Sequence, residues 1–149
     1  MTDPKEMWRR FVDLRNAKDT NALVALYADD GVLEFPGRGQ IKGREAIASY
    51  YQGNFTAHPD ATMTLVTQAV SGQTIITEWN ETGTNTGPIA RADGTSIPAT
   101  GKPFTVNGVA VLEVEGELIK SNRVYFNLMS VLAQLGLMPA PAGAKCSGP

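Results

Sequence analysis

Residues 118–127 read Leu-Ile-Lys-Ser-Asn-Arg-Val-Tyr-Phe-Asn, and residues 128–136 continue as Leu-Met-Ser-Val-Leu-Ala-Gln-Leu-Gly. The Ile, Val, Tyr and Phe of the first stretch favour a β-strand. The Leu, Met, Ala and Gln of the second favour a helix, which a glycine such as Gly136 commonly ends. Asn127 lies at the junction, and asparagine is a preferred residue immediately before a helix. The segment therefore predicts a strand that runs directly into a short C-terminal helix.

Three more stretches upstream have the composition of long strands. They cover residues 62–70, 74–84 and 104–114, and turn sequences at Ser71-Gly72 and Glu115-Gly116 separate them from their neighbours. The second turn predicts a tight hairpin into the strand at 118. Asn107-Gly108 lies inside a predicted strand, and we interpret it as a β-bulge. Residues 87–101 are rich in turn residues and predict a loop or a broken pair of strands.

The first 57 residues show helical patterns instead. Asp3, followed by Pro4 and Glu6, predicts a helix start, and Asp19 or Thr20 predicts a second, short helix. Gly43 precedes a third helix, and a short strand is expected at Val32–Phe35. Helical spacing places on the buried sides of these helices Trp8, Phe11, Val12, Arg15, Leu23, Leu26, Tyr27, Ala46, Ile47, Tyr50 and Tyr51. Helices followed by a long antiparallel sheet indicate the α+β class.

Length and composition limit the organisation and the partners. The chain has 149 residues, of which 42% are hydrophobic and 19% charged, as expected of one domain; we place it at residues 1–138, with a flexible tail at 139–149. The formal net charge of -2 predicts no binding to nucleic acid or to a membrane surface. One cysteine, Cys146, and one histidine, His58, predict neither a disulfide nor a zinc site. The first six residues lack the apolar stretch of a signal peptide, so a cytoplasmic location is expected.

Six short motifs in order resemble the SnoaL-like polyketide cyclases, small enzymes with the nuclear transport factor 2-like (ketosteroid isomerase-like) fold. They are Tyr27-Ala28-Asp29-Asp30, Gly43-Arg44-Glu45-Ala46-Ile47, His58-Pro59-Asp60, Gly83-Thr84-Asn85-Thr86-Gly87, Pro98-Ala99-Thr100-Gly101-Lys102 and Tyr125-Phe126-Asn127. The resemblance covers nearly the whole chain. It implies a cone-shaped, curved antiparallel sheet packed on three N-terminal helices, with a short C-terminal helix and a ligand pocket inside. It also implies enolate chemistry without a cofactor and a homodimer formed through the sheet.

The resemblance implies catalytic roles at two positions that are asparagines in this chain. Family members typically have a histidine in place of Asn85 and an aspartate in place of Asn127. An amide does not titrate usefully, but it can donate a hydrogen bond to an enolate oxygen. Each asparagine has an alternative role as a cap of local backbone. The proton acceptor is then expected elsewhere, and Glu34, flanked by Leu33 and Phe35, is our candidate; its alternative is an outward position on an edge strand.

Other residues are expected to contact the substrate. Strand alternation places Ile75, Thr77, Trp79, Glu81 and Asn85 on one face, and Glu78 and Asn80 on the other. Family resemblance and strand parity together give as substrate-binding candidates Tyr27, Tyr51, Asn54, Phe55, Trp79, Glu81 and Tyr125. The alternative for Trp79 and the tyrosines is a purely structural place in the core. His58 is interpreted as a loop residue.

Three functions remain open from the sequence. The first is an enzyme of cyclase type, catalysing aldol cyclisation or isomerisation of a small apolar oxygenated substrate through an enolate. The second is a non-catalytic small-molecule binder of the same fold, and the third is an epoxide hydrolase-like member. The alternation of Val109, Val111 and Ile119 with polar residues predicts an exposed apolar face and hence the homodimer.

Overall fold

The computed structural model describes residues 3–91 and 93–138. The tail predicted at 139–149 lies outside the described residues. The helices are α1 (Pro4–Asn16), α2 (Thr20–Val24), α3 (Arg44–Ala57) and α4 (Leu128–Gln134), and the strands are β1 (Tyr27–Phe35), β2 (Gly39–Lys42), β3 (Thr62–Ser71), β4 (Thr74–Thr84), β5 (Ile89–Ala90), β6 (Ser96–Ile97), β7 (Pro103–Glu115) and β8 (Leu118–Phe126).

The capping residues predicted at the first two helices and at α4 act as caps. Asp3 accepts a hydrogen bond from the Lys5 backbone N–H at 3.0 Å, and Asp19 accepts one from Ala22 at 3.1 Å. Asn127 accepts from the Ser130 N–H at 3.0 Å, so the chain passes from β8 into α4 at the predicted junction. Such caps satisfy N–H groups that have no partner within the helix.

Six strands form one sheet in the order β2-β1-β8-β7-β4-β3, and β5 pairs with β6 in a separate two-stranded sheet. For residues 87–101 we predicted a loop or a broken strand pair, and this small sheet is the second of these alternatives. The large sheet departs from the predicted antiparallel pattern at one place, because β1 and β8 run parallel. Strands far apart in the chain are not joined by a hairpin, so no turn forces them to be antiparallel.

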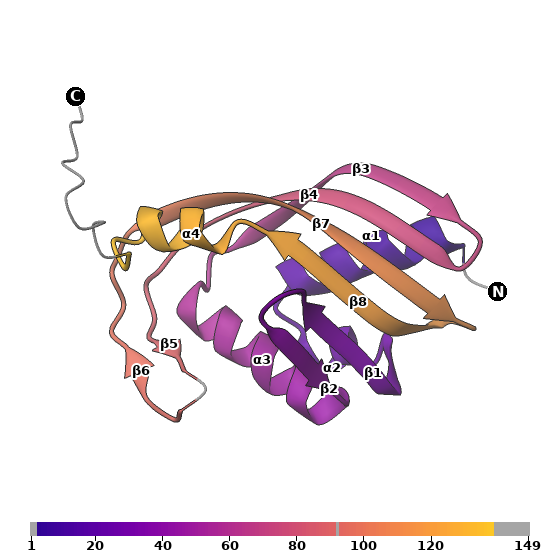
Figure 1. Ribbon diagram of the computed structural model, residues 1–149, viewed down its shortest axis with the longest axis horizontal. Helices are drawn as coiled ribbons and strands as arrows, with labels where there is room; N and C mark the ends of the chain where they lie inside the picture. Colours follow the sequence, from indigo (N-terminus) through magenta and orange to yellow (C-terminus); the bar gives the residue numbers. More distant parts are fainter. Residues whose placement is uncertain (1–2, 92, 139–149) are drawn as a thin grey trace.

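The long strands β3, β4, β7 and β8 curve over α1 and α3, while β1 and β2 lie beside α2 and α3 (Figure 1). The space between the sheet and the helices holds the main core. Aromatic residues from α1, β1 and α3 meet there, with the Trp8 and Phe11 rings stacked at 4.6 Å between centroids. This is the cone-shaped α+β arrangement, and its interior forms the site described below.

Strand β1 begins earlier than predicted, at Tyr27 rather than Val32. The sequence Asp29-Asp30-Gly31 suggested a turn, but the strand passes through it with a register shift against β8 between Tyr27 and Val32. Gly31 is fully packed there, since a Cβ atom would lie 3.1 Å from the carbonyl oxygen of Ile119. Tyr27 is therefore a strand residue, not a helix residue.

The predicted bulge at Asn107-Gly108 is wrong. Pairing of β4 with β7 continues through both residues, with Trp79 opposite Gly108. A Cβ atom at position 108 would lie 2.3 Å from the Trp79 ring, so the glycine makes room for the indole rather than for a bend. A register shift occurs instead near the β7–β8 turn, between Glu113 and Val114.

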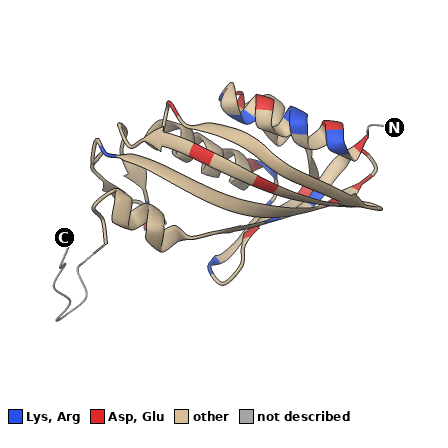
Figure 2. Cartoon of the chain, turned by 90° about the horizontal axis from the view of Figure 1, so that it is seen from above, with Lys and Arg blue, Asp and Glu red and all other residues tan. Residues whose placement is uncertain are grey.

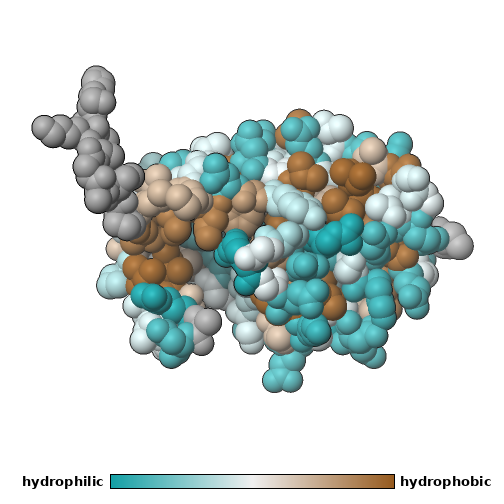
Figure 3. All heavy atoms as spheres, in the orientation of Figure 1, coloured by the Kyte–Doolittle hydropathy of each residue, from teal (hydrophilic) through white to brown (hydrophobic). Residues whose placement is uncertain are grey.

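The outer face of the sheet carries fewer charges than α1 does. Figure 2 shows acidic and basic residues following one another along α1, whereas the strands are mostly uncharged. Exposed apolar side chains on or near the sheet are Val66, Ile76, Val109, Leu118, Tyr125 and Met129. Figure 3 shows hydrophobic residues around α4 and in patches among polar ones. Ile119, expected on this exposed face, is fully buried because the register shift turns it inward.

Candidate functional site

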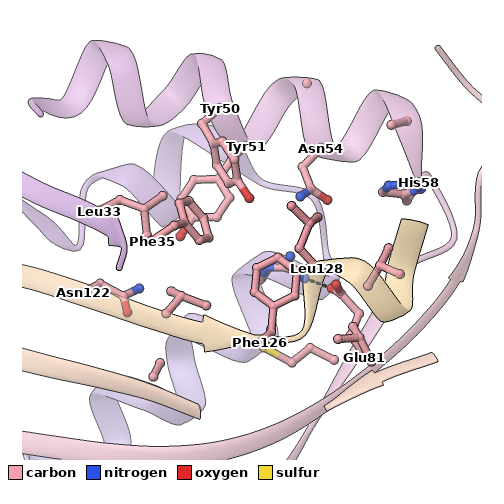
Figure 4. Close-up of a pocket in the computed structure, with 18 of the residues that line it drawn as sticks. Leu33, Phe35, Tyr50, Tyr51, Asn54, His58, Glu81, Asn122, Phe126 and Leu128 are labelled. Atoms are coloured by element: carbon pink, nitrogen blue, oxygen red, sulfur yellow. Dashed lines mark hydrogen bonds and ion pairs between the residues drawn. The ribbon is translucent and has the colours of Figure 1, made fainter. Parts of the chain in front are cut away.

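A cavity of about 360 Å³ lies between the inner face of the sheet and the helices α1 and α3. Its wall is mainly apolar and aromatic, which is typical of small-molecule sites of this size. In Figure 4, Tyr50, Tyr51, Asn54 and His58 extend from α3 on one side, and Asn122, Phe126 and Leu128 lie on the other. The polar lining residues are Arg15, Arg38, Ser49, Asn54, His58, Glu81 and Asn122, with the tyrosines Tyr50 and Tyr51.

The first polar group of the cavity is an ion pair between Arg15 and Glu81. Arg15 lies on the buried side of α1, and Glu81 on the inner face of β4; their side chains are 9% and 8% exposed. Arg15 donates a hydrogen bond through Nη1 to Glu81 Oε2, marked by a dashed line in Figure 4. Burial alone would lower the pKa of Arg15, but the charge of Glu81 and this hydrogen bond outweigh burial and raise it. Arg15 therefore stays cationic inside a largely apolar cavity.

The second polar group is a chain of three neutral side chains. Asn122 on β8 donates through Nδ2 to the Tyr27 hydroxyl at 3.0 Å, and the Tyr27 and Tyr51 hydroxyls are 2.9 Å apart. When the Tyr27 O–H donates to the Tyr51 oxygen, the Tyr51 O–H is free to donate to a ligand in the cavity. Burial raises the pKa of Tyr27 to about 12 and that of Tyr51 well above its ordinary value. Both hydroxyls are therefore protonated near neutral pH.

His58 ends α3 and lines the cavity, where the sequence suggested only a loop residue. Its ring packs edge-on against Phe104 at 4.8 Å between centroids. Burial lowers its pKa, with the nearby charges of Glu81 and Asp60 acting in the opposite direction. The imidazole is therefore mostly neutral at pH 7, and its buried Nδ1 has no hydrogen-bond partner among the described residues.

Four of the predicted substrate-binding residues line the cavity: Tyr51, Asn54, Trp79 and Glu81. Two others lie behind its wall. Tyr27 reaches the site through its hydroxyl bond to Tyr51, and the Phe55 ring stacks on Tyr51 at 6.0 Å between centroids.

Tyr125 and Glu34 do not lie on the cavity. Tyr125 is 47% exposed on the outer face of β8. On β1, the side chains of Leu33 and Phe35 face the cavity, so alternation turns Glu34 to the opposite side of the strand. Glu34 was expected to lie in the pocket among apolar neighbours as the proton acceptor. In the structure it faces away from the cavity, because Leu33 and Phe35 take the side of β1 that faces it.

The two asparagines at the family's catalytic positions are also away from the cavity lining. Asn127 is exposed and caps α4. Asn85 is fully buried and donates through Nδ2 to the carbonyl oxygens of Ala57 at 3.1 Å and Gly87 at 2.9 Å. Its Oδ1 accepts from the Thr100 N–H at 2.8 Å. The amide of Asn85 thus joins the end of α3 to two loops, which is the backbone-capping alternative considered for it.

Among the polar residues of the cavity that sequence reasoning missed are Arg15, Arg38 and Asn122. A signal existed for Arg15, because it follows Trp8, Phe11 and Val12 at helical spacing on a buried side. A cation there requires a buried anion, and Glu81 was already predicted on the inner face of its strand. Asn122 was missed because Tyr125 was expected to face the substrate, which by alternation would turn Asn122 outward. In the structure Val124 and Phe126 face the cavity, and Asn122 faces it with them.

A curved sheet over helices, with an aromatic cavity and a few buried polar groups, defines a cone-shaped domain of the α+β class. The chain belongs to the SnoaL-like domain family, whose family model matches residues 8–122.

Solved structures agree with this fold. A protein assigned as a SnoaL-like polyketide cyclase from Jannaschia sp. CCS1 superposes with a TM-score of 0.79 at 16% identity, covering 93% of this chain and 99% of that one. A protein of the ketosteroid isomerase-like fold from Catenulispora acidiphila, in complex with trimethylamine, gives 0.75 at 27% identity, covering 92% and 96%. AclR from Streptomyces galilaeus, assigned as a hydroxylase, gives 0.75 at 17% identity, covering 91% and 86%. The fold is thus shared by proteins assigned different activities.

No helix within residues 3–91 and 93–138 is long and apolar enough to span a membrane. The same residues contain no group of three or more His, Cys, Asp or Glu side chains placed to hold a metal ion.

Proposed function

We propose that the protein catalyses enolate chemistry, either aldol cyclisation or isomerisation, on a small and largely apolar oxygenated substrate bound in the cavity. The observation that carries the proposal is the presence, on one apolar cavity, of a carboxylate (Glu81) and a protonated hydroxyl (Tyr51). Membership of the SnoaL-like family supports the same class of reaction. The roles first considered for Asn127, Asn85 and Glu34 are replaced, because these residues do not line the cavity.

Glu81 is the proposed proton acceptor. Its Oε2 accepts from Arg15, and its other oxygen has no hydrogen-bond partner among the described residues and is free to meet a substrate C–H. Glu81 takes a proton from the carbon beside a carbonyl group, and the C–H electrons move onto the carbonyl oxygen to form the enolate. A well-placed base of this kind contributes roughly 10²–10⁴-fold to the rate.

Tyr51 is the proposed donor to the enolate oxygen. Tyr27 and Asn122 hold the Tyr51 hydroxyl by the hydrogen bonds described above, so little reorganisation accompanies charge development. In a cyclisation the enolate carbon attacks a second carbonyl group, and the alkoxide oxygen that forms takes the proton back from Glu81. In an isomerisation a conjugated enolate takes that proton from Glu81 at a different carbon of the substrate.

The proposal is tested with 2-tetralone, a two-ring ketone with acidic hydrogens beside its carbonyl. In D₂O the protein is expected to accelerate exchange of these hydrogens, measured by NMR. Glu81→Gln, which keeps the size and a hydrogen bond to Arg15, should lower the accelerated rate at least about 100-fold. The matched control is Glu34→Gln, which should keep the rate. Equal exchange in wild type and Glu81→Gln would contradict the proposal.

A non-catalytic binder is the second candidate, and one observation favours it. Glu81 is neutralised by Arg15, and it is the only Asp or Glu among the cavity-lining residues that the structure describes. Binding of 2-tetralone with no accelerated exchange in wild type would support this candidate. An epoxide hydrolase-like reaction pairs two acids with an arginine around a water. The described lining residues supply only one acid, Glu81, so this reaction is less well supported.

We also propose that two copies associate through the outer face of the sheet. Val109 lies opposite Tyr125 there, and Ile76 lies opposite Val111, which forms an apolar centre on an otherwise polar surface. Sedimentation at micromolar concentration should give a dimer, and Val109→Glu should give a monomer. A wild-type protein that sediments as a monomer would contradict this association.

A further inference from the structure

Arg38 lies at the rim of the cavity, in the turn between β1 and β2. Glycines with positive φ stand on both sides of it, at 82° for Gly37 and 139° for Gly39, and the Arg38 N–H bonds to the Phe35 carbonyl oxygen at 2.8 Å. This tight turn directs the side chain back over the cavity wall. The guanidinium carbon lies 5.2 Å from the centroid of the Phe35 ring and 5.5 Å from that of Phe126.

Arg38 differs from four other arginines of the chain in its partners. Arg9, Arg15, Arg44 and Arg123 each lie within 4.0 Å of a carboxylate oxygen. No carboxylate within residues 3–91 and 93–138 pairs with Arg38, whose guanidinium lies over the two aromatic rings. A guanidinium stacked on rings still has N–H donors available to a carboxylate.

The charges of the cavity wall add up to an excess of one positive charge. Arg15 and Glu81 neutralise each other, and His58 is mostly neutral at pH 7. Among the described lining residues, Arg38 is then the charge without a counter-charge. A ligand that occupies this cavity and carries one negative charge at the rim would balance it.

We propose that Arg38 determines specificity for substrates that carry a carboxylate, which it binds at the rim while the apolar part of the substrate fills the cavity. This inference rests on the proposed function only in taking the same cavity as the substrate site. Arginine suits the role because its planar fork can bind both carboxylate oxygens. The cavity has room for roughly a dozen waters at about 30 Å³ each, which fits a skeleton of two fused rings.

The test compares two probes of nearly equal shape, 2-naphthoate and its methyl ester, by calorimetric titration. Wild type is expected to bind naphthoate about 5- to 10-fold more tightly than the ester, as one charge-assisted contact at a partly exposed site would give. Arg38→Gln should remove this preference and change the affinity for the ester less than about twofold. Arg38→Lys keeps the charge but loses the planar guanidinium, and should retain part of the preference that Arg38→Gln loses.

Arg9→Gln is the matched control, since Arg9 is an exposed arginine of α1 that does not line the cavity. It changes the net charge of the protein as Arg38→Gln does and should leave the preference intact. Equal affinities for the two probes in wild type, failure of both to bind, or an unchanged preference in Arg38→Gln would each overturn the inference.

The two proposals fail separately. Equal affinities of wild type for naphthoate and its ester, together with Glu81-dependent exchange of 2-tetralone, would overturn the role of Arg38 alone. A naphthoate preference that depends on Arg38, without any exchange, would overturn the enolate chemistry alone.

Discussion

The two polar groups of the cavity are both buried in a largely apolar wall, but their polar atoms are satisfied in different ways. Arg15 and Glu81 are full charges that neutralise each other, whereas Tyr51, Tyr27 and Asn122 are neutral and form a chain of hydrogen bonds. Burying unpaired charges costs far more than burying hydrogen-bonded neutral groups. The ion pair is therefore expected to matter for both folding and chemistry, and the hydroxyl chain mainly for chemistry.

The largest effect is expected from breaking the ion pair. Glu81→Ala leaves Arg15 buried without a counter-charge and should lower the free energy of unfolding by about 3–5 kcal/mol. Urea denaturation measures this loss. The double variant Arg15→Met/Glu81→Leu is the control, because it removes both charges and should recover most of the stability. A single variant as stable as wild type would show that the pair is not buried as described.

Changes in the hydroxyl chain should instead affect the exchange rate strongly and the free energy of unfolding only weakly. Tyr51→Phe keeps the ring and removes the proposed donor, so the exchange rate of 2-tetralone should fall about 100-fold. The free energy of unfolding should change by only about 1 kcal/mol, the usual net value of one hydrogen bond. Parallel measurements of exchange and urea denaturation separate the two effects, and an unchanged exchange rate would remove Tyr51 from the mechanism.

Sequence reasoning predicted the class of fold, the caps and the inner face of β4, because each depends on local spacing. Trp79 and Glu81 turn inward as strand alternation requires, and Asn127 caps α4 as its position before a helix suggests. Long-range pairing was not predictable in this way. Arg15 and Glu81 are separated by 66 residues, and no local pattern shows that their elements meet.

Local irregularities account for most of the remaining differences. The register shift between β7 and β8 moves Ile119 to the inner face, whereas Asn122 lies there by simple alternation with Val124 and Phe126. Gly108 has the sequence signature of a turn or bulge, yet it serves the packing of Trp79 on the neighbouring strand. The catalytic positions expected from the family fell on Asn85 and Asn127, whose amides here bind backbone.

A smaller effect should come from Asn127, which contrasts with both polar groups because it lies outside the cavity lining. Asn127→Ala removes the cap of α4 and should lower the free energy of unfolding by about 1 kcal/mol. The exchange rate of 2-tetralone should stay within about twofold of wild type. A large loss of exchange with an unchanged free energy of unfolding would contradict this prediction and indicate that Asn127 takes part in the reaction.

The account is tested most directly by a crystal structure of the Glu81→Gln variant with 2-tetralone bound. The ketone oxygen is expected within about 2.6–3.2 Å of the Tyr51 hydroxyl oxygen, with a carbon beside the carbonyl facing residue 81. A ketone bound with its oxygen turned away from Tyr51, or seated outside the cavity beside Asn127, would contradict it.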